Sequence, residues 1–232
     1  MTTDTDFLTG IRTFYDTIAD DYADRFSGEL AAKPLERAIL GAYAELVGGS
    51  EGEGEGEGEG GRPVADLGCG PGRVTAYLAE LGLPVFGLDL SESMLAVARR
   101  ENPGLRFRQG SMLDLDLPDG GLAGAVSWYS SIHTPVDRLP SLFKEFHRVL
   151  APGGHLLIAF QVGDEPRHHD RPWGHPVSLD FQRRRPEQIA ELLEAAGFAL
   201  RSRTVREPDV ELGESSPQAF LIADRPLPLP LS

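Results

Sequence analysis

The sequence predicts an α/β fold in which a doubly wound sheet of seven strands carries helices on both faces. Short apolar segments alternate with segments of helical periodicity from residue 64 onward, which is typical of a mostly parallel sheet. A run rich in glycine stands where the first predicted strand passes into a helix. The last two apolar segments have no helix between them, so we expect the last strand to be antiparallel.

Composition indicates a globular chain whose 232 residues are expected to form one domain, 1–232. Hydrophobic residues make up 41% of it, but no apolar run approaches the roughly 18 residues that cross a bilayer. The polar start, Met1–Gly10, lacks the basic and apolar order of a secretory signal. The lone cysteine, Cys69, cannot form an internal disulfide and suits a reducing compartment. We therefore expect a cytoplasmic protein, a monomer or homodimer, without membrane contact.

The chain is strongly acidic, with a formal net charge of −14. Five glutamates alternate with glycine in Glu51–Gly60, and we expect a disordered loop over 50–61 because this run has nothing apolar to bury. The rest of the chain is also acidic and repels phosphate backbones, so no nucleic acid partner is expected. Arg183–Arg185 is interpreted as a solvated face. Residues 226–232, rich in proline and leucine, are expected to be an extended tail.

The first half of the predicted core alternates three strands with two helices. Val64–Leu67 is a short apolar strand that ends in glycines. Apolar residues then recur at helical spacing over 74–81, and Gly82 ends the pattern. Val85–Leu90 is the second strand, and Ser91 is well placed to cap the helix that closes near Asn102. Leu105–Gln109 is the third strand.

The second half continues the alternation and closes the sheet. Leu122–Trp128 is the fourth strand, and the next helix carries an apolar stripe over 139–150. Pro152-Gly153-Gly154 is expected to end that helix, and His155–Phe160 is the fifth strand. A helix opened by Pro186 and ended by Gly197 follows. The two final strands are expected at about Phe198–Val205 and Gln218–Ala223.

The strongest functional pattern is Asp66-Leu67-Gly68-Cys69-Gly70-Pro71-Gly72-Arg73. Its three glycines permit left-handed turns and a close approach of main chain to a ligand. Asp89 ends the next strand, where an acid commonly accepts hydrogen bonds from ribose hydroxyls. A dinucleotide site would need glycine in place of Arg73, and Asp66 would repel a pyrophosphate but suits an ammonium or sulfonium. A cation joined to a ribose points to S-adenosylmethionine.

At this point the sequence resembles the class I, seven-strand, Rossmann-like methyltransferases that use S-adenosylmethionine. The resemblance is to the small-molecule branch related to ubiquinone and menaquinone methyltransferases, and it covers about Phe14–Ala223. Val64-Ala-Asp-Leu-Gly-Cys-Gly-Pro-Gly-Arg looks like the family's first motif, and Gly87-Leu-Asp-Leu-Ser looks like its second. Leu150-Ala-Pro-Gly-Gly-His-Leu resembles the turn into strand five. Phe14-Tyr-Asp-Thr-Ile-Ala-Asp-Asp-Tyr resembles an N-terminal helix covering the cofactor.

The resemblance implies lid helices within 1–45, a cofactor-binding core over 62–225, and a role for each matching residue. Asp66 and the turn would hold the methionine part, Asp89 the ribose, and Leu90 and Met112 the two faces of the adenine. Tyr15 and Tyr22 would reach the cofactor from the lid, the latter through its hydroxyl to the carboxylate. The family commonly has aspartate where this chain has Ser111. The expected cofactor contacts are Tyr15, Tyr22, Asp66, Gly68, Cys69, Gly70, Asp89, Leu90, Met94, Ser111, Met112, Trp128 and Tyr129.

His133 lies just after the fourth strand, near where the transferred methyl should point, and is the candidate catalytic residue. It is expected either to accept a proton from the acceptor or to act as a hydrogen-bond partner. His168, His169 and His175 crowd a later segment, interpreted as a solvated or substrate-lining loop without metal. We predict methyl transfer to a small molecule with S-adenosylhomocysteine as product. The alternatives are a nicotinamide-dependent oxidoreductase and a non-catalytic cofactor-binding protein.

Overall fold

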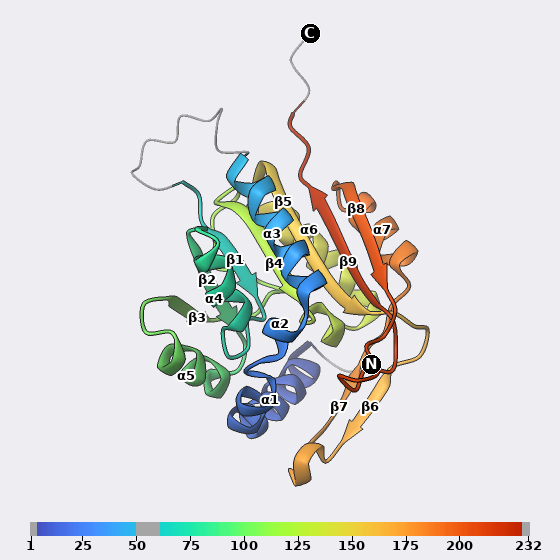
Figure 1. The fold of residues 1–232 in the computed structure, drawn as a ribbon. Helices are drawn as coiled ribbons and strands as arrows, with labels where there is room; N and C mark the ends of the chain where they lie inside the picture. The colour runs from blue at the N-terminus through green and yellow to red at the C-terminus, as the bar shows by residue number, and fades with distance from the viewer. Residues whose placement is uncertain (1–3, 50–60, 229–232) are drawn as a thin grey trace.

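The structure, a computed structural model, describes residues 4–49 and 61–228, with side chains from residue 7 onward (Figure 1). The predicted glutamate–glycine loop lies outside the described residues, apart from Gly61, and so do the last four residues of the predicted tail. A central sheet organises the rest. Its strands are β1 (Val64–Leu67), β2 (Val85–Asp89), β3 (Arg106–Gln109), β4 (Leu122–Trp128), β5 (Leu150–Gln161), β8 (Ala199–Arg206) and β9 (Gln218–Asp224).

The seven strands stand in the order β3-β2-β1-β4-β5-β9-β8, which confirms the predicted doubly wound sheet. Strands β1 to β5 pair in parallel. The last strand, β9, inserts between β5 and β8 and runs antiparallel to both, as predicted. The chain winds outward in opposite directions from β1 and from β4. Ligands of such sheets bind at this switch point, beyond the carboxyl ends of the strands.

Helices cover both faces of the sheet because each carries an apolar stripe. On one face, α3 (Pro34–Gly49) and α4 (Arg73–Glu80) pack on a cluster that includes Val64 and Val126. On the other, α6 (Leu139–Val149) and α7 (Pro186–Ala195) pack on alternate residues of the same strands. The helix α5 (Glu92–Glu101) begins where predicted, since the Ser91 hydroxyl accepts a hydrogen bond from the Met94 amide at 3.1 Å.

Two predictions about the region around β5 are wrong. The helix α6 ends at Val149, before the proline and glycines, because Leu150 is already extended and pairs with Leu122 of β4. The segment predicted as a loop contains an antiparallel hairpin, β6 (Arg167–Asp170) and β7 (Ser178–Phe181). The local signal for these strands is weak, because polar histidine and arginine side chains occupy most of β6.

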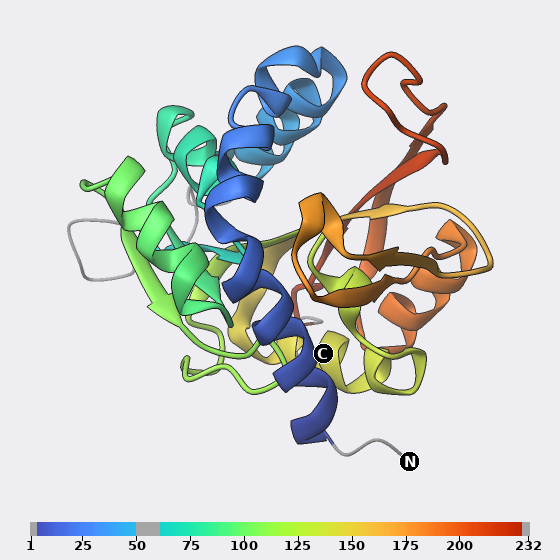
Figure 2. The same cartoon turned by 90° about the horizontal axis from the view of Figure 1, so that it is seen from below.

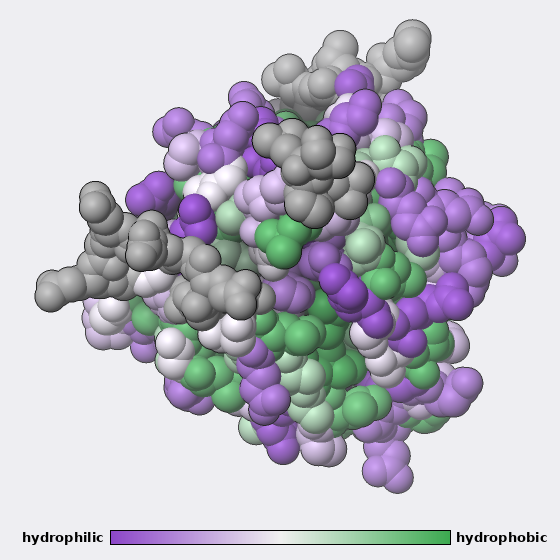
Figure 3. Space-filling model, turned by 90° about the horizontal axis from the view of Figure 1, so that it is seen from above, coloured by the Kyte–Doolittle hydropathy of each residue, from purple (hydrophilic) through white to green (hydrophobic). Residues whose placement is uncertain are grey.

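The N-terminal helix α1 (Asp4–Phe26) and the short α2 (Glu29–Ala32) lie at the carboxyl edge of the parallel strands, and α1 crosses the lower face of the molecule (Figure 2). The buried side of α1, which includes Phe14 and Ile18, packs against α5 and the β6–β7 hairpin. The opposite end of the sheet exposes both polar and apolar residues (Figure 3). The helix α1 therefore covers the edge where a ligand is expected.

Candidate active site

A cleft of about 920 Å³, including its open mouth, lies between the carboxyl ends of β1, β2 and β4 and the helix α1. All fourteen residues predicted for the site line this one cleft. They are Tyr15, Tyr22, Asp66, Gly68, Cys69, Gly70, Asp89, Leu90, Met94, Ser111, Met112, Trp128, Tyr129 and His133.

The glycine-rich turn has the conformation that its sequence predicts. Gly68, Gly70 and Gly72 have φ values of +77°, +54° and +84°, which residues with a Cβ rarely adopt. A Cβ on Gly68 would lie 2.3 Å from the Cβ of Ser130, so the turn is packed closely on the end of β4. On Gly70 the same atom would meet nothing within 4 Å. The main chain at Gly70 is therefore open to a ligand in the cleft.

Asp66 is a buried carboxylate with one satisfied oxygen. Its Oδ2 accepts a hydrogen bond from the Thr75 hydroxyl at 2.6 Å, whereas Oδ1 has no hydrogen-bond partner among the described residues. Burial raises the pKa of Asp66 from 3.8 to about 7, and the nearby Asp89 adds to the rise. A buried acceptor without a donor is unusual in folded proteins. Oδ1 is therefore suited to a cationic donor supplied by a ligand.

Asp89 is held by main-chain donors at the carboxyl end of β2. Its Oδ2 accepts from the Gly70 amide and its Oδ1 from the Ser91 amide, both at 2.8 Å. Burial raises the pKa of Asp89, while the amides of Ser91 and Gly70 lower it in part. Each carboxylate oxygen can accept a second hydrogen bond. Asp89 thus links the glycine-rich turn to β2 and retains capacity for hydroxyl donors.

His133 ends the short helix η2 (Ser131–His133) and contacts α1 directly. Its Nε2 lies 2.7 Å from the hydroxyl of Tyr15, and its ring also packs on Phe181 of β7. Its Nδ1 is buried without a hydrogen-bond partner in the described part of the chain. Burial lowers the pKa of His133 to about 3 and outweighs a raising effect of the Asp180 main chain. The imidazole is therefore neutral at pH 7.

Aromatic side chains form the wall at the end of β4. Trp128 packs on Phe220 with ring centroids 5.3 Å apart, and Tyr129 stands edge-on to Trp128. Tyr129 has a φ of +53°, an unusual value for an aromatic residue, and its buried hydroxyl has no hydrogen-bond partner among the described residues. Such backbone strain is common at functional sites. Met94, expected as a cofactor contact, packs under α1 and also lines the cleft.

Several lining residues were not predicted from the sequence. Ser130 was missed although it follows Tyr129, because only the fold shows that its hydroxyl donates to the Leu67 carbonyl behind the turn. Arg73 stands inside the recognised motif but was interpreted only as evidence against a dinucleotide. The helical spacing of the first residues of α1 could have indicated an inward face. The missed residues are Phe7, Leu8, Ile11, Pro71, Arg73, Val74, Leu88, Gly110, Leu113, Ser130 and Thr134.

The later histidines do not join the cleft. His168 pairs with Asp180 across the β6–β7 hairpin at 2.7 Å, and His175 pairs with Asp21 of α1 at 2.6 Å. Within residues 4–49 and 61–228, no group of three or more histidine, cysteine, aspartate or glutamate residues could hold a metal ion. Burial raises the pKa of the Cys69 thiol well above its usual value, which does not suit a nucleophile.

Comparisons with known proteins agree with this geometry. Residues 64–154 match a family model described as a methyltransferase domain. A trans-aconitate 2-methyltransferase of Methylobacterium nodulans is 39% identical over 111 residues, which cover 45% of this chain and 41% of that protein. The chain spans 41% to 60% of the length of four curated relatives.

Two solved structures share the fold over nearly the whole chain. One is the 1,6-didemethyltoxoflavin-N1-methyltransferase of Burkholderia thailandensis, with bound 1,6-didemethyltoxoflavin and S-adenosylhomocysteine. It has a TM-score of 0.69 at 23% identity, and the matched region covers 97% of this chain and 92% of that protein. The other is the magnesium protoporphyrin IX methyltransferase of Synechocystis, with bound S-adenosylmethionine. It has a TM-score of 0.68 at 17% identity, and the matched region covers 97% of this chain and 100% of that protein. The predicted fold is thus confirmed. No helix in the described part of the chain is long and apolar enough to cross a membrane.

Proposed function

We propose that this chain is a class I S-adenosylmethionine-dependent methyltransferase that transfers a methyl group from S-adenosylmethionine to a small-molecule acceptor. The observation that carries the proposal is the pair of buried acids in one cleft. Asp66 presents an oxygen without a partner, and Asp89 lies at the ribose position of the fold. A ligand with a cationic amino acid end and a ribose satisfies both.

The residues of the cleft fit the cofactor from end to end. Asp66 would receive the ammonium of the methionine part, and the open main chain at Gly70 would lie beside it. Asp89 would accept hydrogen bonds from the ribose hydroxyls. Leu90 and Met112 would cover the two faces of the adenine, with Ser111 at its edge. The cofactor supplies an electrophilic methyl group, so the protein mainly has to align the two reactants.

At the acceptor end, His133 and Tyr15 are proposed to contact the acceptor together. The neutral imidazole can accept a proton, but no acidic side chain among the described residues contributes to raising the pKa of His133, so a buried imidazolium would be poorly stabilised. The hydrogen bond to Tyr15 also occupies Nε2. This arrangement favours His133 as a hydrogen-bond partner that aligns the acceptor, one of the two roles predicted from the sequence.

A small-molecule acceptor is supported by relatives whose name specifies trans-aconitate, while the name of another specifies malonyl-[acyl-carrier protein]. Four further proposals rest on the sequence alone. They are membership of the ubiquinone and menaquinone branch, a single domain over 1–232, a cytoplasmic location, and a monomeric or homodimeric state. The acidic composition supports the absence of a nucleic acid partner.

The experiment is methyl transfer from labelled S-adenosylmethionine, with the purified full chain and a panel of small carboxylic acids, phenols and amines. We expect label in at least one acceptor class and its loss in the Asp89→Ala variant. Tight cofactor binding without transfer to any of these acceptors would favour the non-catalytic alternative.

A further inference from the structure

One buried cation has no role in the site described above. Arg184 lies between β7 and α7 and is 7% exposed, so the predicted solvated face over Arg183–Arg185 is wrong for this residue. No acidic side chain in the described part of the chain contributes to its pKa, which burial alone lowers. Its Nε is buried and has no hydrogen-bond partner among the same residues. A buried charge without a counter-ion is costly in free energy.

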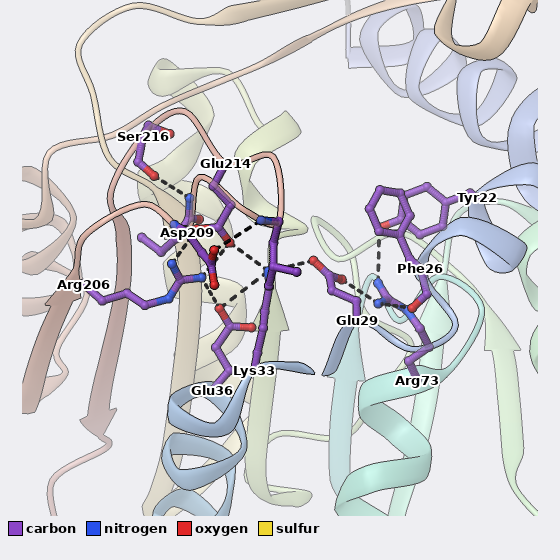
Figure 4. A network of polar contacts seen from close by, with 12 residues as sticks. Tyr22, Phe26, Glu29, Lys33, Glu36, Arg73, Arg206, Asp209, Glu214 and Ser216 are labelled. Atoms are coloured by element: carbon purple, nitrogen blue, oxygen red, sulfur yellow. Dashed lines mark hydrogen bonds and ion pairs between the residues drawn. The ribbon is translucent and has the colours of Figure 1, made fainter. Parts of the chain in front are cut away.

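Two other basic side chains with little exposure have acids beside them. Lys33 pairs with Glu29 at 2.8 Å and with Glu214 at 2.9 Å, and Arg206 pairs with the same Glu214 at 2.5 Å (Figure 4). These contacts join α2 and the start of α3 to the loop between β8 and β9. Arg184 instead donates to a main-chain carbonyl and to a side-chain amide oxygen, so ion pairing does not explain its burial.

The main chain of Arg184 is anchored at the end of β5. Its amide donates to the Gln161 carbonyl at 2.9 Å, and its carbonyl accepts from the Gly163 amide at 3.3 Å. Val162, between these two residues, forms an isolated parallel bridge with Arg184. The base of the side chain is thus fixed on the central sheet.

The guanidinium reaches the turn that follows β4. It donates to the Thr134 carbonyl at 2.6 Å, while the main-chain amide of Gln182 donates to the Ile132 carbonyl at 3.0 Å. These two carbonyls stand on either side of His133 in the chain. Arg184 also lies 3.5 Å from the side-chain oxygen of Gln182, which joins the two donors. The segment after β7 therefore holds the main chain on both sides of His133.

This turn needs external support because it is short. The helix η2 has three residues, and the Thr134 amide closes it on the Ser131 carbonyl at 3.0 Å. Two contacts then define the imidazole of His133. Its Nε2 lies 2.7 Å from the Tyr15 hydroxyl, and its ring packs on Phe181 with centroids 4.8 Å apart. A small shift of the turn would change both contacts, and Thr134 itself lines the cleft.

We propose that Arg184 is a positioning residue for the acceptor end of the cleft, which holds the turn around His133 so that the imidazole meets Tyr15 and the acceptor in one orientation. The inference rests on the proposed function, in which His133 aligns the acceptor. Displacing an aligning group by about 1 Å is enough to lower the rate of a reaction. The free-energy cost of the buried charge is then a cost of ordering the site, not a contribution to the stability of the fold.

Two substitutions of Arg184 separate this role from support of the fold. Arg184→Met removes the charge and the donors, whereas Arg184→Lys keeps the charge and an end group that can donate to Thr134. With the full chain and labelled S-adenosylmethionine, we expect Arg184→Met to lower kcat about five- to fiftyfold and Arg184→Lys to stay within about fivefold of wild type. The affinity for S-adenosylhomocysteine should change less than about threefold in both variants. The thermal midpoint of Arg184→Met should stay within about 3 °C of wild type, because relief of the buried charge offsets the lost hydrogen bonds.

Arg185→Met is the matched control, because Arg185 is exposed and pairs with the equally exposed Asp164 at 2.9 Å. It should keep turnover within about twofold of wild type. In a His133→Ala background, Arg184→Met should lower turnover by less than about a further twofold, since it acts through that ring. Full multiplication of the two losses, or a loss of turnover matched by an equal loss of cofactor affinity, would overturn the proposal. Failure of Arg184→Met to fold would also overturn it, because the cation would then serve the fold.

Nuclear magnetic resonance of the histidine rings tests the geometry without turnover. His133→Ala identifies the signal of His133 among the six histidines. That signal should move in Arg184→Met and stay in place in Arg185→Met, and a signal that does not move in Arg184→Met would overturn the positioning role. If the wild-type chain neither binds S-adenosylmethionine nor transfers its methyl group, the proposed function is wrong, whereas a moved His133 signal still shows that Arg184 sets the turn.

Discussion

Replacing Asp66 with asparagine should make the ligand-free protein more stable at pH 8 and at the same time weaken cofactor binding. The rise of the Asp66 pKa from 3.8 to about 7 corresponds to about 4 kcal/mol of unfavourable free energy for the ionised form in the folded state. The folded state therefore binds more protons than the unfolded state between these pH values. Stability from this group is present below about pH 4 and is lost as the pH rises toward 7.

Asparagine keeps an acceptor for the Thr75 hydroxyl and carries no charge. Denaturant unfolding at pH 8 should give the variant an extra stability of about 1 to 4 kcal/mol, and the difference should vanish near pH 4. Asp116→Asn removes an exposed carboxylate and serves as control. With saturating S-adenosylhomocysteine the order should reverse, because only wild type gains the ammonium contact. A variant less stable than wild type at pH 8 without ligand would show that the buried charge of Asp66 does not destabilise the fold.

Three further outcomes are expected. Asp89→Ala should weaken cofactor binding by about 1.5 to 3 kcal/mol in calorimetry and lower stability by about 1 to 3 kcal/mol, since two amides lose their acceptor; an unchanged dissociation constant would place the ribose elsewhere. His133→Ala and Tyr15→Phe should each lower turnover less than about a hundredfold, with no added loss in the double variant. Wild-type turnover at saturating substrate should not fall between about pH 8 and pH 5, because His133 is already neutral over this range. A loss of about 10³ or more in His133→Ala, together with a wild-type turnover profile that shows a pKa of about 6.5, would instead identify a general base. Gly68→Ala should destabilise the chain by about 2 to 4 kcal/mol, and adding Ser130→Gly should restore part of the loss, which thermal unfolding can measure.

The core of the fold could be predicted because its signals are local. The left-handed turns at Gly68, Gly70 and Gly72 require the residue that the sequence supplies. The apolar stripe of α6 and the cap at Ser91 are likewise set by residues close in the chain. The hairpin β6–β7 was missed because its strands are held by packing of Leu179 and Phe181 against α1, far away in the sequence.

The candidate site could be predicted as a set of residues but not as a set of interactions. The motifs identify Asp66, Asp89 and His133, but they do not show that Tyr15 meets His133 across 118 positions of the chain. Arg73 was missed as a residue that lines the cleft because its partners on α1 and α2 are likewise distant. Burial, which sets the protonation of Asp66 and His133, is a property of the folded chain alone.

Calorimetric titration of the full chain with S-adenosylmethionine, S-adenosylhomocysteine and NAD shows which of these ligands the cleft binds. We predict dissociation constants in the low micromolar range for the first two, about −8 kcal/mol, and far weaker binding of NAD. The affinity for S-adenosylmethionine should fall as the pH drops below 7, because protonated Asp66 cannot pair with the ammonium. NAD binding more tightly than S-adenosylmethionine would instead identify the cleft as a dinucleotide site.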